Sequence, residues 1–229
     1  MNNFLQFFLD ALFPKNCFGC EKEGEYLCSA CFRKIELLPI EYCFLCQKVK
    51  SFDGICQTCQ EITKIDKIWP AVSYQNMVVK ALIENLKFSY IEDLAEILAE
   101  FLFARLQERE FTKNSADFFV VPIPLHKKRL RWRGFNQAEL LAKSICQKTE
   151  LPLLSALIRS KKTQQQALLN KEKRVANVED CFSLSENVRG KKILLLDDVM
   201  TTGQTLLSAS QKLKEGGAEQ IIILTSAHG

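Results

Sequence analysis

Two uninterrupted apolar runs, at 193–196 and 221–224, dominate the C-terminal part of the chain. Neither run shows the alternation of a half-exposed strand, so each is predicted to be a parallel strand that is buried on both faces. Between them, residues 206–214 carry apolar side chains at helical spacing, and Gly216 and Gly217 then supply a helix stop signal. The pattern predicts one βαβ unit with a right-handed crossover.

The middle of the chain shows the same kind of alternation. Apolar runs predict strands at 69–74 and 118–124, and helical periodicity predicts helices at 78–86, 91–106 and 138–146. Strands that alternate with helices in this way indicate an α/β domain with a mostly parallel sheet that is flanked by helices.

The sequence before the first of these strands has a different character. We therefore divide the chain near residue 68, into an N-terminal module at 1–68 and an α/β domain at 69–229. A length of 229 residues is enough for one good core plus such a small module. The net charge of +4 is mild and decides nothing by itself.

The extreme N-terminus places Phe4, Leu5, Phe8 and Leu12 on one helical face, which predicts a packed amphipathic helix. A signal peptide is not expected, because this segment has no basic start and Asp10 interrupts it. No apolar run reaches the length needed to span a bilayer. We therefore expect a cytoplasmic protein, with attachment to a membrane surface as a minority alternative.

Eight of the ten cysteines lie before residue 60 and form four Cys-x-x-Cys pairs. A pair with this spacing can aim two thiolates at one metal ion, and two pairs complete a tetrahedral site that suits Zn²⁺. We expect two structural zinc ions, one bound by the first two pairs and one by the last two, with interleaved pairing as the alternative. The predicted ligands are Cys17, Cys20, Cys28, Cys31, Cys43, Cys46, Cys56 and Cys59.

Other uses of these cysteines fit the sequence less well. A disulfide framework requires an oxidising compartment, and nothing in the sequence indicates export. A redox motif would occur once beside a βαβ unit rather than four times in a row, and an iron–sulfur cluster is a further alternative. With all eight thiolates used structurally, no open position is left for a catalytic zinc. Cys146 and Cys181 are expected to be plain buried thiols.

Two carboxylates and a turn rich in hydroxyls follow the predicted strand at 193–196. Ligands of α/β units bind where a strand ends and the next helix begins, because free N–H groups and the helix dipole favour an anion there. The turn therefore suits a phosphate, whereas the carboxylates suit the hydroxyls of a ribose and a Mg²⁺ ion. A capped turn without a ligand is the plainer alternative. The predicted site comprises Asp197, Asp198, Met200, Thr201, Thr202, Gly203, Gln204 and Thr205.

A basic segment follows the predicted strand at 118–124, with five basic side chains within the seven positions 127–133. We expect a loop that binds a second anionic group, for which pyrophosphate is the candidate. The interleaved aromatic residues Trp132 and Phe135 also fit single-stranded DNA, through phosphate contacts and base stacking. A solvated positive face is the remaining alternative. The candidate residues are His126, Lys127, Lys128, Arg129, Arg131 and Arg133.

The segment 159–177 is polar and has no apolar periodicity. Such a segment can form a flexible lid that closes over a reactive sugar and excludes water, although a solvated linker fits the same pattern. The candidate lid residues are Lys162, Thr163, Gln166 and Arg174.

Taken together, these motifs resemble the ComF family, the competence protein F group that also includes GntX-like proteins. The cysteine pairs resemble its double zinc ribbon, and the segments 121–126 and 133–137 resemble its most characteristic signature. The string at 197–203 resembles the loop of type I phosphoribosyltransferases that binds 5-phosphoribosyl 1-pyrophosphate (PRPP). A further pattern of the family is matched by Thr163, Gln166, Leu169, Arg174 and Asn177.

The resemblance implies a type I phosphoribosyltransferase fold behind a zinc ribbon, with PRPP and Mg²⁺ bound at Asp197 and Asp198, the candidate catalytic residues. It also implies a role in natural transformation, in the handling of single-stranded DNA. It names no acceptor for the ribosyl group, so catalysis of pentosyl transfer stays open. The alternative is a non-catalytic competence factor that binds single-stranded DNA, or docks a DNA-uptake helicase or another competence protein, with a regulatory or vestigial PRPP site. The oligomeric state also stays open.

Overall fold

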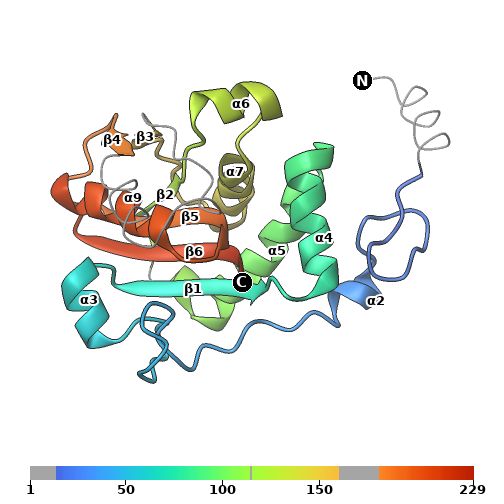
Figure 1. Ribbon diagram of the computed structural model, residues 1–229, viewed down its shortest axis with the longest axis horizontal. Helices are drawn as coiled ribbons and strands as arrows, with labels where there is room; N and C mark the ends of the chain where they lie inside the picture. The colour runs from blue at the N-terminus through green and yellow to red at the C-terminus, as the bar shows by residue number, and fades with distance from the viewer. Residues whose placement is uncertain (1–13, 114, 160–180) are drawn as a thin grey trace, which may run out of the picture.

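The computed structural model describes residues 14–113, 115–159 and 181–229. Within these ranges the chain forms a parallel sheet with helices on both faces, preceded by an extended segment that carries the cysteine pairs (Figure 1). The helix predicted at the N-terminus and the candidate lid residues Lys162, Thr163, Gln166 and Arg174 lie outside the described residues. Among the residues that are described, no helix is both long and apolar enough to cross a membrane.

Four strands form the main sheet, in the order β1-β6-β5-β2, and every neighbouring pair is parallel. Their inner residues are buried, as expected for a parallel sheet that is covered on both faces. All of the strands predicted from apolar runs are present. Their bounds are β1 (Lys67–Ser73), β2 (Phe118–Pro122), β5 (Lys192–Met200) and β6 (Gln220–His228).

Strand β5 is longer than its apolar run predicts. The pairing with β6 continues beyond Leu196, from Asp197 opposite Thr225 to Met200 opposite His228. The two acids therefore belong to the end of a strand and not to a loop that follows it. Their backbone positions are fixed by the sheet.

Helices cover both faces of this sheet. The connection from β1 to β2 runs across the sheet in one direction, and the connection from β5 to β6 runs in the opposite direction. Right-handed crossovers therefore place α5, in the first connection, and α9, in the second, on opposite faces of the sheet. Helix α7 packs against α5, β2 and β5. The bounds of the longer helices are α4 (Met77–Glu84), α5 (Leu94–Glu108), α7 (Gln137–Thr149) and α9 (Gln204–Glu215).

Shorter elements connect these layers. Helix α4 runs on into a π-helical turn, η1 (Asn85–Ser89), and a 3-10 turn, η2 (Phe111–Lys113), follows α5. A small antiparallel pair, β3 (Leu157–Arg159) and β4 (Phe182–Leu184), flanks the segment 160–180. The remaining short helices are α2 (Ser29–Phe32), α3 (Gln57–Thr63) and α6 (Lys127–Arg133).

The cysteine-rich segment packs on the α/β domain at two places. Near the first two pairs, Phe32 stacks on Phe101 of α5 with ring centroids 4.4 Å apart. Near the last two pairs, the Ile68 N–H donates to the Asp53 carbonyl at 2.9 Å, beside the start of β1. The chain between them runs along β1 (Figure 1), where the Leu38 N–H donates to the Ala71 carbonyl at 2.8 Å.

Arg105 of α5 holds this connecting chain to the sheet from inside the protein. Its side chain is 1% exposed, and its guanidinium donates to the carbonyls of Pro70, at 2.9 Å, of Ala71, at 3.2 Å, and of Leu38. Glu108 accepts a further bond at 2.9 Å. Because a buried cation is stable only when its donors are used, this set of carbonyls explains how an arginine is accommodated in the core.

We predict that Arg105→Leu lowers the free energy of unfolding by about 3 kcal/mol, because it leaves buried carbonyls without donors. Urea denaturation of the purified protein measures the change. Arg131→Leu, which alters an exposed arginine of α6, is the matched control and should leave the unfolding midpoint almost unchanged. Equal effects of the two variants would contradict this assignment.

Candidate functional site

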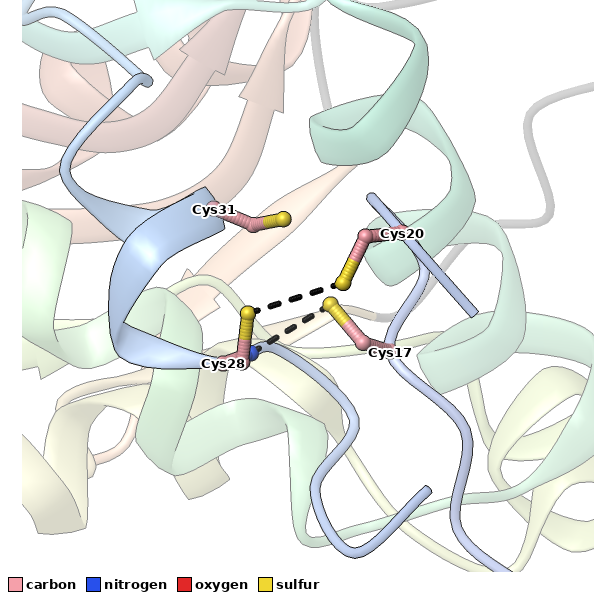
Figure 2. Close-up of side chains that lie close together, drawn as sticks. All are labelled: Cys17, Cys20, Cys28 and Cys31. Atoms are coloured by element: carbon pink, nitrogen blue, oxygen red, sulfur yellow. Dashed lines mark hydrogen bonds between the residues drawn. The ribbon is translucent and has the colours of Figure 1, made fainter. Parts of the chain in front are cut away.

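The eight cysteines of the four pairs form two groups. In each group the four sulfur atoms lie within 4.8 Å of one another, and Figure 2 shows those of the first group pointing toward a common centre. The first group comprises Cys17, Cys20, Cys28 and Cys31, and the second comprises Cys43, Cys46, Cys56 and Cys59. Successive pairs are therefore grouped as predicted, into two four-sulfur sites that could each hold one metal ion.

The surroundings of these sulfurs fit thiolate ligands of zinc. The backbone N–H groups of Gly19 and Cys28 donate to Cys17 Sγ at 3.4 and 3.3 Å. In the second group, a hydrogen bond from the Lys48 N–H lowers the pKa of Cys46 to about 6. Donors of this kind stabilise the negative charge that a metal ligand must carry. Four sulfurs around one centre suit structural Zn²⁺ and leave no open position for a reaction.

The two remaining cysteines lie away from these groups. Cys181 is buried beside the start of β4. Cys146 is partly buried on α7, and burial raises the pKa of its thiol to about 11. Cys181 is thus buried as expected, whereas Cys146 is only partly buried, although its raised pKa still makes the thiol poorly reactive.

A cavity of about 590 Å³ opens at the carboxyl end of β5. It is lined by Ile123, just after β2, and by the whole segment 197–205. The eight residues of the predicted sugar-phosphate site therefore lie together on one wall. Arg129 and Arg133 of α6 line the same cavity, so the two segments that the sequence singled out face each other.

The phosphate end of the predicted site is the start of α9. Gly203 is the N-cap residue and has φ +73° and ψ −5°, a left-handed conformation that glycine adopts without strain. The N–H groups of the first helical turn have no partners within the helix, and they lie at the positive end of its dipole. Thr201 and Thr202 are exposed beside them and can add hydroxyl donors. This end of the cavity can hold an anion such as a phosphate.

The carboxylate pair lines the same cavity as this anion site and the cations. Asp198 is 8% exposed, and its Oδ2 atom is 2.9 Å from Lys87 Nζ. The Asp198 N–H donates to Asp197 Oδ1 at 2.9 Å. Burial and the adjacent charge of Asp198 raise the pKa of Asp197 to about 7. Two adjacent carboxylates of this kind can accept hydrogen bonds from a diol or coordinate a divalent cation.

The basic segment 127–133 is a helix, α6, and not the loop that the sequence analysis expected. The helix begins after His126, whose Nδ1 atom accepts from the Lys128 N–H at 3.2 Å, and it ends at Gly134. Positions that are three and four residues apart share one face of a helix. Arg129, Trp132 and Arg133 accordingly line the cavity together. Four predicted residues are not among those that line it, namely His126, Lys127, Lys128 and Arg131.

Several residues of the cavity wall, polar side chains among them, were not among the predicted site residues. Asn136 and Gln137 belong to the signature at 133–137, which was noted as a motif but not assigned to the site. Lys87 and Phe88 come from η1, and Arg159 ends β3. Asn136 is held in place because its Nδ2 donates to the Ile123 carbonyl at 3.0 Å. The break between two helical patterns at 87–88 was the one sequence signal for η1.

Burial affects the cations of this cavity as well as its acids. It lowers the pKa of Arg133 and of Arg159, although both stay charged at neutral pH. The Nε atom of Arg133 is buried and has no hydrogen-bond partner among the described residues. Partly desolvated guanidinium groups that face a cavity are suited to bind phosphate or pyrophosphate.

We predict that the purified protein carries two zinc ions per chain and that Cys28→Ser loses one of them. Only the first group depends on this sulfur, so the second should keep its ion. Metal analysis by mass spectrometry measures the ratio. Cys146→Ser is the control and should retain both ions. Loss of both ions in Cys28→Ser, with the fold retained, would contradict two separate centres.

Family models match both parts of the chain. Residues 8–60 match a double zinc ribbon domain, and residues 133–229 match a phosphoribosyl transferase domain. The second match begins at the last residue of α6 and covers α7, β5, α9 and β6, so it includes the segment 197–205 but not Lys87 or Arg129 of the cavity wall. The parallel sheet flanked by helices is thus the type I phosphoribosyltransferase fold, behind a zinc ribbon with two four-cysteine sites.

Relatives of similar length match most of the chain. Competence protein ComFC of Bacillus subtilis is 30% identical over 211 residues, which cover 86% of this chain and 81% of that protein. Competence protein F of Haemophilus influenzae is 29% identical and covers 85% of this chain and 87% of its own. DNA utilization protein YhgH of Escherichia coli is 29% identical, with 78% and 93% covered. The chain belongs to the ComF family of competence proteins.

Proposed function

We propose that the cavity beside β5 binds PRPP together with Mg²⁺. One observation carries the proposal: the N-terminus of α9, a carboxylate pair and two arginines of α6, Arg129 and Arg133, all line a single cavity. A ribose that carries a phosphate and a pyrophosphate requires the same three kinds of group. The match of the region to a phosphoribosyl transferase domain supports this assignment.

Each group of PRPP has a counterpart in the cavity. The turn 201–205 receives the 5′-phosphate through its N–H groups and threonine hydroxyls. Asp197 and Asp198 accept from the ribose hydroxyls and hold Mg²⁺ directly or through water. Arg129 and Arg133 face the pyrophosphate. Lys87, whose Nζ atom lies 2.9 Å from Asp198 Oδ2, would be available to the anionic ligand if a metal ion replaced it beside this carboxylate.

The reaction class that follows is displacement at the anomeric carbon, with pyrophosphate as the leaving group. The arginines stabilise the charge that grows on the leaving oxygen. The candidate lid, with Lys162, Thr163, Gln166 and Arg174, would shield the reacting carbon from water. No acceptor follows from the described residues, so the proposal covers binding and leaving-group stabilisation only.

We place this activity in natural transformation, in the cytoplasm. The relatives from Bacillus subtilis and Haemophilus influenzae are named competence proteins, and that from Escherichia coli a DNA utilization protein. Eight thiols that serve as metal ligands, and not as disulfides, are consistent with a reducing compartment. The division at residue 68, between zinc ribbon and phosphoribosyltransferase-like domain, is part of the same proposal.

We predict that the double variant Asp197→Asn/Asp198→Asn weakens binding of Mg²⁺–PRPP by about 30-fold, which corresponds to roughly 2 kcal/mol. Isothermal titration calorimetry measures the affinity. Asp93→Asn alters an exposed carboxylate outside the cavity and is the matched control. An affinity that is unchanged in the double variant would sink the proposal.

The pH dependence of the same titration provides an internal check. The raised pKa of Asp197 means that its carboxyl is protonated in the free protein below about pH 7, and a Mg²⁺ ion must displace that proton. Affinity should therefore rise between about pH 6 and pH 8 and then level off. The part of this dependence that belongs to Asp197 disappears in the single variant Asp197→Asn, whereas the part that belongs to the phosphates of PRPP remains.

A second function, the binding of single-stranded DNA, is supported by exposed side chains of α6 and η1, including two rings that also line the cavity. Trp132 is 64% exposed and contacts Tyr90 with ring centroids 6.1 Å apart, while Phe88 is 57% exposed beside the Arg133 guanidinium. Lys127, Lys128 and Arg131 are exposed on the same short helix and do not line the cavity. Exposed rings among cations are the features that bind single strands. Phe135, expected to take part, is instead partly buried against the core.

We predict that Lys127→Gln/Arg131→Gln weakens binding to a fluorescent oligonucleotide and reduces the slope of log affinity against log salt by about 1.4, the value for two lost phosphate contacts. Fluorescence anisotropy over a salt series measures both. Binding of PRPP should be unaffected, because neither residue lines the cavity. The control Lys113→Gln/Lys143→Gln removes two exposed lysines elsewhere. Affinity that does not depend on salt, or an equal loss in the control, would count against this function.

A further inference from the structure

The first and third cysteine pairs are internal copies of one turn. Their sequences are Cys-Phe-Gly-Cys at 17–20 and Cys-Phe-Leu-Cys at 43–46, and each is preceded by a residue in an isolated antiparallel bridge, Asn16 with Glu23 and Tyr42 with Lys50. The two copies differ at their third position. In the first copy this residue is Gly19, and a Cβ built there would lie 2.8 Å from Cys31 Sγ, so no side chain fits.

In the second copy the third residue is Leu45, and its side chain reaches the proposed phosphate turn. A Cβ built on Gly203 would lie 3.7 Å from Leu45 Cδ2 and 3.5 Å from Met200 Cε. Leu45 is partly buried and packs against the core cluster, although zinc turns of this kind need no apolar side chain at this position to bind metal. The contact therefore serves the α/β domain and not the metal site.

The neighbouring residue of the same copy supports the other side of this turn. The Phe44 ring lies 4.7 Å from the ring of His228, measured between centroids. His228 pairs with Met200 at the end of β5, and the Gly229 N–H donates to the Met200 carbonyl at 3.1 Å. Of two adjacent side chains of the second zinc turn, Leu45 thus approaches Gly203 directly, and Phe44 contacts His228, the strand partner of Met200.

We propose that Leu45 is a positioning residue for the phosphate turn 201–205, so that the second zinc turn, through this side chain, helps to set the affinity for a 5′-phosphate. The proposal rests on the function proposed above. A phosphate is held by N–H groups whose direction depends on the backbone of this turn. Residues 201–203 belong to no helix or strand, so the turn relies on what packs beneath it. The backbone around Leu45 is in turn fixed by Cys43 and Cys46, which flank it as ligands.

The test compares Leu45→Gly, which gives the second copy the sequence of the first, with the conservative variant Leu45→Met and the control Val49→Ala. Val49 is 49% exposed in the same zinc turn, so its truncation removes a side chain without removing this contact. All proteins are used as the full chain with two zinc ions, confirmed by metal analysis. Binding of ribose 5-phosphate and of Mg²⁺–pyrophosphate is measured by calorimetry, and amide hydrogen exchange is followed at 201–206.

We expect Leu45→Gly to weaken ribose 5-phosphate about tenfold and to speed exchange at 201–206, with pyrophosphate binding and zinc content unchanged. Leu45→Met should keep the ribose 5-phosphate affinity and the exchange rate at 201–206 near their wild-type values, and Val49→Ala should change neither. Wild-type exchange and affinity in Leu45→Gly would overturn the positioning role while leaving the proposed function intact. A wild-type protein that binds no ribose 5-phosphate would instead overturn the proposed function. An equal loss of pyrophosphate binding would show general destabilisation and would also overturn the inference.

Discussion

The parallel pairing of β5 with β6 is the interaction on which the candidate site depends. It extends from Lys192 opposite Gln220 to Met200 opposite His228, which is longer than the apolar centre of either strand requires. The extension keeps two adjacent aspartates in extended backbone at the carboxyl end of β5. Without this pairing, aspartate residues favour turns. It also fixes the starting point of α9. The anion end and the acidic end of the cavity therefore keep a constant separation.

Charge balance is the second constraint on this site. Two carboxylates line the same cavity as an ion-paired lysine and three arginines, Arg129, Arg133 and Arg159. The excess of positive charge favours the binding of polyanions, whereas the two carboxylates repel a phosphate that binds without a cation. A ligand that brings its own divalent cation resolves both demands, because the metal satisfies the acids while the phosphates satisfy the cations.

Much of this arrangement could be predicted from the sequence because it depends on local patterns. Apolar runs located all four parallel strands, and the cysteine spacing gave both metal groups with the correct pairing. The helix α6 was missed for a physical reason: its residues are good helix formers, but Leu130 and Trp132 are exposed, so no apolar stripe marks it. Lys87 and Arg159 were missed because only tertiary folding brings them beside Asp198 and Asp197, and no spacing in the chain encodes that.

The π-helical turn η1 has a consequence for how the chain can change. A π turn holds one more residue per turn than the α-helix that precedes it, and in this protein it spans Asn85–Ser89, with Lys87 at its centre. If one residue of the wide turn were deleted, an ordinary α-helical turn would replace it, and the residues after the turn would keep their orientation. The residues inside the turn would not, so Lys87 and Phe88 would no longer both keep their directions. The extra residue therefore lets one turn of helix supply both a counterion for Asp198 and a ring of the cavity wall.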